Sequence, residues 1–355
     1  MEALVSTSYW AGKRVFVTGH TGFKGTWLLA MMRVLGAKVA GYALDPPTAP
    51  SMFDQIAGSE LCQDIRGDIR DLSRLQRAMS DFAPEFIFHL AAQPIVLAAR
   101  EHGVDTVDTN VRGTACVLEA ARRVGSLRSI VSVTTDKVYR NVEWCWPYRE
   151  ADALGGHEPY GASKACAEIV TEAWAHSFLE PAGVAVASAR AGNVIGGGDW
   201  APARLVPDIV RAWQASRALT IRSPQSIRPW QHVLEPLAGY VALAAALAEK
   251  PSGLPRSFNF GPREEDAQPV ARICELANCA LDGGLEVIVA EATTGYESRM
   301  LRLDSSLAQS DLAWRPRLDL ESAIKWTIDW YRGVHRGADA RALTIEQLER
   351  YQSLG

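Results

Sequence analysis

The chain has few cysteines: six among 355 residues, with no Cys-x-x-Cys pair. They stand singly, mostly within apolar runs, at Cys62, Cys116, Cys145, Cys166, Cys274 and Cys279. This arrangement is typical of packed free thiols in a reducing compartment, so we expect a cytoplasmic protein. The cysteines and the seven histidines also lack the ligand spacing of a zinc site, and we expect no metal.

Long apolar runs and a strong charge imbalance are also missing. The longest apolar run, around Leu237 to Leu247, is interrupted by Gly239 and is too short to span a bilayer. Residues Met1 to Gly12 lack the basic and apolar regions of a secretion signal. The 37 Lys and Arg residues against 41 Asp and Glu residues give a net charge of −4, which argues against nucleic acid as the main partner. The 48% hydrophobic content is enough for a large core in one or two domains.

The first half of the sequence alternates short β-branched runs with longer amphipathic segments. We expect strands at Arg14–Val17, Lys38–Leu44, Phe86–Leu90, Ser129–Thr134 and Val184–Ala189, and helices at Thr26–Leu35, Leu72–Phe82, Thr114–Val124 and Ser163–Ser177. This alternation predicts an α/β fold with a doubly wound parallel sheet. Such sheets bind ligands at the carboxyl ends of their strands, where Gly19, Ala91, Thr135 and Asn193 fall.

After about Asn193 the pattern becomes irregular, because glycines and prolines interrupt it. We therefore expect residues 1–192 to form a first domain, to which 234–260 return. Residues 193–233 and 261–355 would form a smaller mixed domain. Near the end of the chain, Thr344 to Gln347 has the pattern of a capping box, which predicts a short terminal helix that begins there.

A glycine-rich loop, Gly19-His20-Thr21-Gly22-Phe23-Lys24-Gly25, joins the first expected strand to the first helix. The missing side chains let backbone N–H groups approach a pyrophosphate, which the helix N-terminus also attracts. Between a first strand and a first helix, this interpretation is favoured over an ordinary turn. The loop, with Phe23 and Lys24, is therefore the expected dinucleotide site.

Acidic residues follow the second and third strands. Asp45 can accept hydrogen bonds from the ribose hydroxyls of NAD, or it only begins the turn at Pro46-Pro47. No arginine lies between Val39 and Pro50 to neutralise a 2′-phosphate, so NAD is favoured over NADP. Asp68, followed by Ile69, either meets the adenine or caps the next helix.

The fourth strand ends in His89-Leu90-Ala91-Ala92-Gln93. Small side chains at this point let the chain pass beside the cofactor. We interpret His89 as a hydrogen-bonded core residue rather than a catalytic one. Leu90, Ala91, Ala92 and Gln93 are candidate cofactor contacts.

Residues 134 to 164 carry the clearest chemical signal. Tyr160-x-x-x-Lys164 places a phenol and an ammonium one helical turn apart on one face. A nearby positive charge favours phenolate, so Tyr160 can act as a base below its ordinary pKa of about 10. Thr135-Asp136-Lys137 supplies a second acid/base pair. Two such pairs indicate more than one proton transfer, which is more than a simple alcohol dehydrogenase needs.

These residues resemble the extended short-chain dehydrogenase/reductases that act on nucleotide sugars. The matching motifs are Gly19-x-x-Gly22-x-x-Gly25, His89-Leu90-Ala91-Ala92, Thr109-Asn110-Val111-x-Gly113-Thr114, Tyr160-x-x-x-Lys164 and Arg190-x-Gly192-Asn193. The resemblance implies an NAD-binding Rossmann domain, with Thr109, Tyr160 and Lys164 among the cofactor contacts, and a smaller substrate-binding domain. It also implies a homodimer or a dimer of dimers, in which 114–124 and 163–177 pair with a second subunit. Alternatively, both helices bury only against their own sheet.

Within that superfamily the chain looks most like the CDP-glucose 4,6-dehydratases. The shared segments are Gly19 to Gly25, Gly41 to Thr48, Thr135-Asp136-Lys137 where relatives have Thr-Asp-Glu, Asn141 to Glu150, Gly192 to Trp200 and Arg228 to Val233. Two segments depart from the family pattern. Leu97 to Gly103 replaces the usual Arg, Ser-Tyr and Pro, and Ala201-Pro202-Ala203 stands where acids are usual.

The resemblance implies that CDP-glucose is oxidised at carbon 4, loses water across carbons 5 and 6, and regains the hydride at carbon 6. Tyr160 would take the carbon-4 hydroxyl proton, assisted by Lys164, and Thr135 would hydrogen-bond that oxygen. Asp136 would donate a proton to the departing hydroxyl, a role that requires a raised pKa of the kind that burial can produce. Lys137 would remove the carbon-5 proton, stabilise the enolate charge, or form only a surface ion pair.

The diphosphate of such a substrate needs cations, and arginine pairs with phosphate through two hydrogen bonds. Arg228 and Arg204 are the first candidates, and Arg299 is the next. Asn193 is expected to hold the diphosphate or the sugar, and Gln93 is a further substrate candidate. Trp230 either bounds the site or packs in a core. Two other functions remain open: a nucleotide-sugar 4-epimerase, and an NAD-binding protein without turnover.

Overall fold

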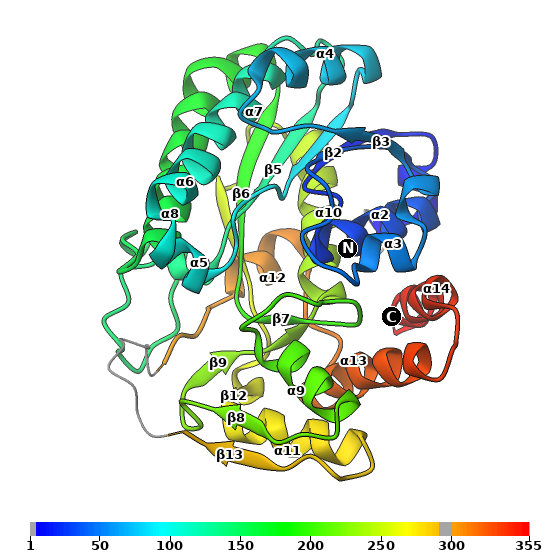
Figure 1. Ribbon diagram of the computed structural model, residues 1–355. Helices are drawn as coiled ribbons and strands as arrows, with labels where there is room; N and C mark the ends of the chain where they lie inside the picture. Colours follow the sequence, from blue (N-terminus) through cyan, green and yellow to red (C-terminus); the bar gives the residue numbers. More distant parts are fainter. Residues whose placement is uncertain (1–4, 291–299, 355) are drawn as a thin grey trace.

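A seven-stranded parallel sheet forms the centre of the computed structural model, which describes residues 5–290 and 300–354 (Figure 1). In spatial order the strands are β11 (Ser257–Phe260), β6 (Ala185–Ala191), β5 (Ser129–Val133), β4 (Phe86–His89), β1 (Arg14–Thr18), β2 (Lys38–Ala43) and β3 (Gln63–Arg66). Every neighbouring pair runs parallel. The doubly wound parallel sheet predicted from the sequence is confirmed.

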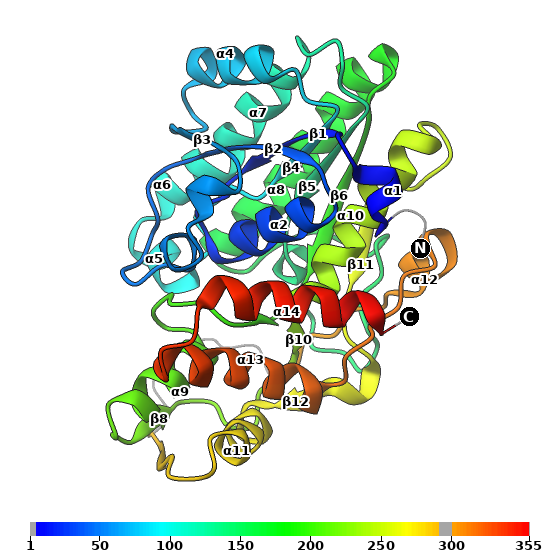
Figure 2. The same ribbon diagram turned by 90° about the vertical axis from the view of Figure 1, so that its right-hand side faces the viewer.

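Helices cover both faces of this sheet (Figures 1 and 2). One face carries α4 (Leu72–Phe82), α7 (Gly113–Ala121) and α8 (Pro159–Trp174), and the other carries α2 (Phe23–Val34) and α10 (Leu234–Glu249). Successive residues of a strand point to opposite faces. In β1, Val15 and Val17 therefore belong to one hydrophobic core and Phe16 to the other. A sheet buried on both sides needs the near-continuous apolar strands that this sequence has.

Residues 234–260 join the large sheet rather than the irregular part of the chain. Helix α10 packs on β5 and β6, and β11 pairs with β6 so that Phe260 lies opposite Ala191. This packing brings the first half of α10 under the carboxyl ends of the central strands.

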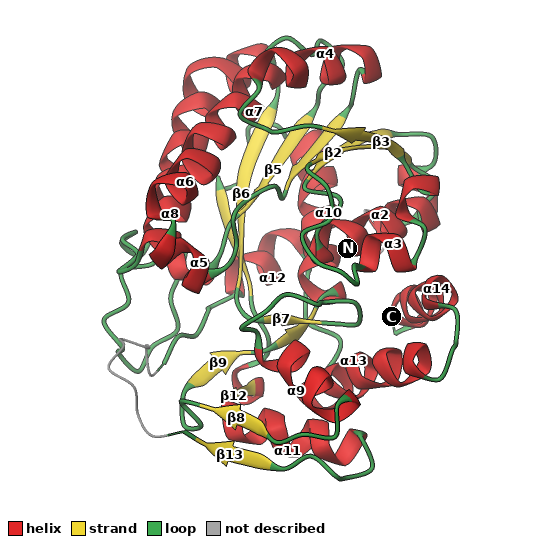
Figure 3. Ribbon diagram, viewed as in Figure 1, coloured by secondary structure: helices red, strands yellow, loops and turns green. Residues whose placement is uncertain are grey.

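A second group of short elements lies beyond those carboxyl ends (Figure 3). Its strands pair as β7 (Val194–Ile195) with β10 (Gln231–His232), β9 (Ile227–Pro229) with β12 (Ala267–Pro269), and β8 (Leu219–Ile221) with β13 (Val287–Val289). Its helices are α9 (Leu205–Gln214), α11 (Val270–Ala280) and α13 (Leu320–His335), whereas α12 (Ser306–Leu312) packs on α10 and β11 of the large sheet.

Shorter helical segments complete the chain: α1 (Thr7–Trp10), α3 (Met52–Gln55), η2 (Gly58–Glu60), α5 (Val96–Glu101), α6 (Gly103–Val107), η3 (Asp108–Arg112), η4 (Asp136–Val138), η5 (Ala175–Leu179), η6 (Glu180–Ala182) and η7 (Glu264–Asp266). Within the described ranges, no helix is long and apolar enough to cross a membrane.

The capping box predicted at Thr344 is wrong. The last helix, α14 (Ala340–Ser353), begins after Asp339, whose side chain accepts a hydrogen bond from the backbone N–H of Arg341. Thr344 lies inside this helix, where its hydroxyl donates to the Ala340 carbonyl (2.8 Å) and accepts from the indole of Trp330 (3.0 Å). A threonine hydroxyl can bond the carbonyl four residues back, so the sequence pattern alone does not mark a helix start.

Candidate active site

The glycine-rich loop is closed by backbone contacts that exclude side chains. A Cβ atom on Gly25 would lie 2.1 Å from the carbonyl oxygen of Gly19, and one on Gly19 would lie 2.6 Å from the backbone nitrogen of Ala91. Gly19 also has a φ of +77°, which favours glycine. Gly22 is the N-cap of α2, and no side chain caps this helix. The first turn of α2 therefore offers backbone N–H groups to an anion, which fits the pyrophosphate of NAD.

The end of β4 lies against this loop. His89 is buried and bridges two hydroxyls: its Nδ1 lies 2.7 Å from Thr18 Oγ1, and its Nε2 lies 2.9 Å from Thr114 Oγ1. Burial lowers the pKa of His89 to about 3. The expectation of a hydrogen-bonded core residue is confirmed. Leu90, Ala91 and Ala92 follow it as partly exposed residues beside Gly19.

Asp45 follows the end of β2, and its side chain is 90% exposed. It lies next to Arg66, which is outside the range from Val39 to Pro50 in which the sequence analysis looked for an arginine. Arg66 Nη1, from the end of β3, lies 3.7 Å from the Asp45 carboxylate, and Arg66 Nη2 lies 2.8 Å from Asp64. The parallel register places Arg66 opposite Ala43, so the strand-end rule could have found it. The carboxylates of Asp45 and Asp64 both lie beside the Arg66 guanidinium. Carboxylate oxygens that can accept hydrogen bonds from ribose hydroxyls are therefore present at the end of β2.

The segment after β3 shows that Asp68 does not cap the next helix, which was one of its two predicted roles. Helix α4 is capped by Asp71, which accepts from the backbone N–H of Arg74 (3.0 Å). Asp68 does not cap it; its carboxylate is bound by the backbone N–H and guanidinium of Arg70, and that hydrogen bonding lowers the pKa of Asp68. Ile69 is buried against Gly113. The adenine contact of Asp68 stays a prediction.

The amide of Gln93 is occupied by its own loop. Its Nε2 donates to the Ile95 carbonyl (3.1 Å) and to Thr106 Oγ1 (3.0 Å), and its Oε1 accepts from the Ile95 N–H (2.5 Å). Asn110 accepts from the Gln93 N–H (2.8 Å) and donates to Ser163 Oγ on α8 (2.9 Å). Asn110 therefore ties the end of β4 to the helix of Tyr160. The neighbouring Thr109 is half-buried in η3.

Thr135 and Asp136 follow β5 directly. The Thr135 hydroxyl donates to Asp136 Oδ1 (3.0 Å). Asp136 is only 2% exposed, and among the described residues its Oδ2 has no hydrogen-bond partner. Gly192 leaves the space beside it, because a Cβ at that position would lie 3.1 Å from Oδ2. A buried carboxyl oxygen with an open hydrogen-bonding position can serve a bound ligand.

Tyr160 and Lys164 lie in the first two turns of α8, which begins at Pro159 rather than at the predicted Ser163. Glu158 caps this helix and accepts from the N–H groups of Tyr160 (2.8 Å) and Gly161 (2.7 Å). The predicted helix began too late because the proline at the first helical position was not used as a start signal. Both side chains are buried, and α8 packs against η4 and β6.

The pKa of Tyr160 departs from the expected direction. Burial raises it to about 12, although a hydrogen bond with Thr135 and the charge of Arg204 lower it. Lys164 does not act on the phenol here, because its ammonium donates to the Val133 carbonyl of β5 (3.0 Å). Burial lowers the pKa of Lys164 to about 8, against the opposing charge of Glu168. The spacing in the sequence places the two side chains on one face of the helix. It does not determine which acceptor the Lys164 ammonium group hydrogen-bonds.

Further cations lie around this cluster. Burial lowers the pKa of Lys24 to about 7, and the charges of Arg204 and Lys164 act in the same direction. Lys24 Nζ lies 5.8 Å from the ring centroid of Tyr240. Lys24 therefore points from the glycine loop toward Asp136 and Lys164. Lys137 is half-buried in η4 beside Asp136.

Tyr240 is a site residue that the sequence analysis missed. It is buried on α10, and among the described residues its hydroxyl has no hydrogen-bond partner. Burial and the charge of Tyr160 raise its pKa. Its Ala- and Leu-rich surroundings carry no sequence signal, because only the packing of α10 under β5 and β6 brings it near Tyr160.

The predicted substrate residues have different structural environments. Arg204 stands directly before α9, pairs with Asp199 (3.0 Å), and its charge acts on Tyr160. Arg228 is buried on β9, and the Asn193 carbonyl accepts from the Gln231 N–H (3.0 Å). Trp230 is buried in the core and donates its indole N–H to the Gln268 carbonyl (3.2 Å), as in the core alternative. Arg299 lies outside the described residues.

No group of three or more His, Cys, Asp or Glu side chains that could hold a metal ion occurs in residues 5–290 and 300–354. The chemistry that the site can support is that of a dinucleotide loop facing a phenol, a buried carboxyl group and several amines.

The chain belongs to the NAD dependent epimerase/dehydratase family, whose sequence model matches residues 15–261. It is 43% identical over 355 residues to the CDP-glucose 4,6-dehydratase of Salmonella typhimurium, covering 99% of each chain. It is 27% identical to the probable dTDP-glucose 4,6-dehydratase of Sinorhizobium fredii, covering 90% of this chain and 92% of that one.

Solved structures show the same fold. DesIV, a dTDP-glucose 4,6-dehydratase of Streptomyces venezuelae with NAD bound, aligns with a TM-score of 0.76 at 23% identity, over 92% of this chain and 99% of that one. A UDP-glucose 4-epimerase of Stenotrophomonas maltophila with NAD bound aligns with a TM-score of 0.79 at 21% identity, over 92% and 100%. At these identities the likeness establishes the fold and not the reaction.

Proposed function

We propose that the protein is an NAD-dependent nucleotide-sugar 4,6-dehydratase that converts CDP-glucose into CDP-4-keto-6-deoxyglucose. The observation that carries this proposal is the Asp136 carboxyl group, which is buried beside Thr135 and Tyr160 with one oxygen open to a ligand. An enzyme that only oxidises and reduces carbon 4 needs no such acid. The 43% identity to the Salmonella enzyme supports CDP-glucose as the substrate.

Bound NAD supplies the acceptor and later the donor of a hydride. The glycine loop holds the pyrophosphate end, and Asp45 holds the ribose hydroxyls. Tyr160 takes the proton of the carbon-4 hydroxyl, and Thr135, which lies close enough to lower the pKa of the phenol, bonds that oxygen. The pKa of Tyr160 must fall from about 12 for this step, and a cation brought against the phenol lowers it.

Elimination follows from the new ketone. A carbonyl at carbon 4 makes the proton on carbon 5 acidic, so that the carbon-6 hydroxyl can leave as water. Asp136 Oδ2 donates a proton to the departing hydroxyl, and Lys137, the neighbouring residue, removes the carbon-5 proton. Arg204 and Arg228 hold the substrate diphosphate, and Asn193 holds the diphosphate or the sugar.

The same proposal includes the two domains of the chain and its location in the cell. Residues 1–192 with 234–260 bind NAD, and residues 193–233 with 261–355 bind the nucleotide sugar. All six cysteines are free thiols, which supports a cytoplasmic location.

A second copy of the chain is the proposed partner of an exposed apolar helix face. This face is formed by side chains of α6, η3, α7 and α8: Val104, Val107, Val111, Ala115, Val170 and Trp174. Val104 is 84% exposed, which is unusual for a valine on a helix. A two-fold contact would bury this face against itself, giving a homodimer or a dimer of dimers.

The test is to incubate purified protein and NAD with CDP-glucose, and in parallel with dTDP-glucose and UDP-glucose, and to measure the alkaline absorbance of a 4-keto-6-deoxy sugar. Faster formation of this product from CDP-glucose than from dTDP-glucose or UDP-glucose supports the proposal. Release of a different hexose without that absorbance would identify an epimerase. Binding of NAD with no change in any sugar would identify a protein without turnover.

A further inference from the structure

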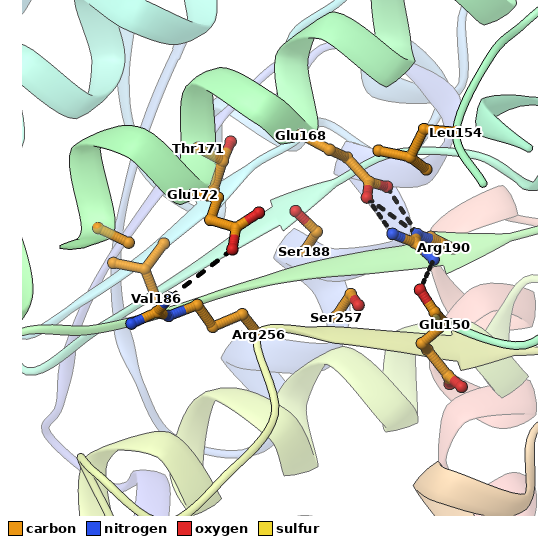
Figure 4. A pocket seen from close by; sticks show the side chains of 11 residues that line it. Glu150, Leu154, Glu168, Thr171, Glu172, Val186, Ser188, Arg190, Arg256 and Ser257 are labelled. Atoms are coloured by element: carbon orange, nitrogen blue, oxygen red, sulfur yellow. Dashed lines mark hydrogen bonds and ion pairs between the residues drawn. The ribbon is translucent and has the colours of Figure 1, made fainter. Parts of the chain in front are cut away.

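A buried ion pair joins Arg190 to Glu168 (Figure 4). Arg190, on β6, is 3% exposed, and Glu168, on α8, is 5% exposed. Arg190 Nε donates to both carboxylate oxygens of Glu168 (2.9 Å each), and its Nη2 donates to Glu168 Oε2 as well. Removing two charges from water costs several kcal/mol per ion in general. Apolar side chains would fill this space at lower cost, so the pair is expected to have another role.

Each member of the pair holds one end of the segment that follows β5. Thr134 donates its hydroxyl proton to Glu168 Oε1 (2.5 Å). At the other end, Arg190 Nη1 donates to the Tyr139 hydroxyl oxygen (2.7 Å), and the guanidinium lies 4.9 Å from the centroid of the Tyr139 ring. Thr135, Asp136 and Lys137 lie between these two attachment points.

The attachment at Tyr139 is itself anchored. The Tyr139 hydroxyl donates to Asn259 Oδ1 on β11 (2.8 Å), and Asn259 Nδ2 donates to the Tyr148 carbonyl (2.9 Å). Arg190 Nη1 also donates to the Glu150 carbonyl (3.1 Å). The network thus connects the segment after β5 to the strands β6 and β11 and to the helix α8.

We propose that Arg190 and Glu168 are positioning residues that clamp residues 134–139 from both ends and so hold Thr135 and Asp136 at the sugar. This inference rests on the proposed dehydratase function. A misplacement of a reacting group by about 1 Å can cost about 100-fold in rate. Glu168 also lies one helical turn after Lys164 and acts on its charge, so the clamp includes the helix of Tyr160.

Two variants remove one attachment each and leave the ion pair in place. Thr134→Val removes the hydroxyl that binds Glu168, and Tyr139→Phe removes the hydroxyl that binds Arg190 and Asn259. We expect each to lower kcat about 10- to 100-fold, with the KM for CDP-glucose and the Kd for NAD changed less than about twofold. Thr134→Ser, which keeps the hydroxyl, should restore kcat.

Thr171→Val is the matched control. Thr171, also on α8, lines a pocket together with Glu168 and Arg190 (Figure 4). Its hydroxyl donates to the Ala167 carbonyl (2.8 Å) and to Ser132 Oγ (3.4 Å) and does not bond the ion pair. It should lower the thermal midpoint about as much as Thr134→Val and leave kcat unchanged. Equal loss of kcat in all three variants, or wild-type kcat in Thr134→Val and Tyr139→Phe, overturns the clamp.

A crystal structure of the Thr134→Val, Tyr139→Phe double variant separates this inference from the proposed function. Displaced Thr135 and Asp136 side chains support the clamp even if the wild-type protein makes no 4-keto product, in which case only the dehydratase proposal fails. Unchanged positions of both side chains overturn the clamp whatever the activity.

Discussion

At the scale of single residues, Asp136 carries most of the functional argument. It combines a buried carboxyl group, a hydrogen bond from Thr135 at 3.0 Å and one oxygen open to a ligand. A carboxyl group in this position can donate a proton to a leaving hydroxyl, which distinguishes elimination from simple redox chemistry at carbon 4.

Asp136→Asn should keep NAD binding and lose most of the 4-keto product. An amide cannot supply the proton, so we expect kcat to fall by about 100-fold or more. Product is measured by its alkaline absorbance and NAD binding by titration calorimetry. The control is Asp329→Asn, which removes an exposed ion pair with Lys325 on α13. Undiminished product formation in Asp136→Asn would exclude the acid role.

Lys137 can be tested for its role as a base rather than a fixed charge. Arginine keeps a positive charge but does not give up its proton in proteins. We therefore expect Lys137→Arg to lose about 100-fold in kcat and to stop the exchange of the carbon-5 proton with deuterated solvent. Exchange is measured by mass spectrometry of the recovered sugar nucleotide. An active arginine variant would show that the charge alone suffices.

At the scale of elements, the turn between β1 and α2 depends on the absence of side chains. Gly25→Ala would place a Cβ 2.1 Å from the Gly19 carbonyl oxygen, so the loop must open. We expect the Kd for NAD, measured by calorimetry, to rise about tenfold or more, because the N–H groups of α2 move away from the pyrophosphate. Gly125→Ala is the control, since a Cβ there meets nothing within 4 Å. Equal affinities for NAD in the two variants would contradict this account of the loop.

The first turn of α10 holds the end of the chain through a buried acid. Glu235 accepts hydrogen bonds from the N–H groups of Arg317 (3.0 Å) and Leu318 (2.8 Å) and from the Tyr351 hydroxyl of α14 (2.8 Å). Burial raises the pKa of Glu235 to about 7 from the ordinary 4.5. A raised acid pKa means that the folded state binds the proton more tightly than the unfolded state does.

Folding stability should therefore fall as pH rises through this window. The contribution of protonated Glu235 is fully present below pH 4.5 and is lost as pH rises through about 7, a change on the order of 3 kcal/mol. Urea unfolding at pH 5 and pH 8 measures it. Glu235→Gln can keep the acceptor and cannot titrate, so its stability should change less between the two pH values. An identical pH dependence in both proteins would show that Glu235 does not titrate in this range.

At the scale of the whole molecule, the apolar helix face predicts self-association. Val104→Lys together with Val107→Lys places two charges where the second copy would pack. We expect the Kd of the dimer to rise at least about tenfold. Light scattering after size exclusion measures the mass. Val289→Lys, on the exposed strand β13, is the control because that valine is exposed to a degree between those of Val104 and Val107. A monomeric wild-type protein would remove the second copy from the proposal.

The large sheet could be predicted because its signals are local. Apolar β-branched runs at βαβ spacing lie within a few residues of β1, β2, β4, β5 and β6. The strand-end rule then placed Gly19, Ala91, Thr135 and Asn193 near one edge without any contact being known. Two helix starts were predicted wrongly for different reasons. The start of α8 was placed at Ser163 because the start signal of Pro159 was overlooked, and that of α14 was placed at Thr344 because a capping pattern also fits residues inside a helix.

The sequence by itself determined which side chains reach the edge of the sheet, since strand and helix periodicity is a property of neighbouring residues. Only the tertiary structure decided how those side chains are paired. Lys164 binds the Val133 carbonyl, Lys24 turns toward Tyr240, and Arg190 joins Glu168 to Tyr139. The partners in each of these contacts lie far apart along the chain. Burial and charge at the site depend on that packing, so spacing in the sequence could not predict the pKa values of Tyr160 and Lys24.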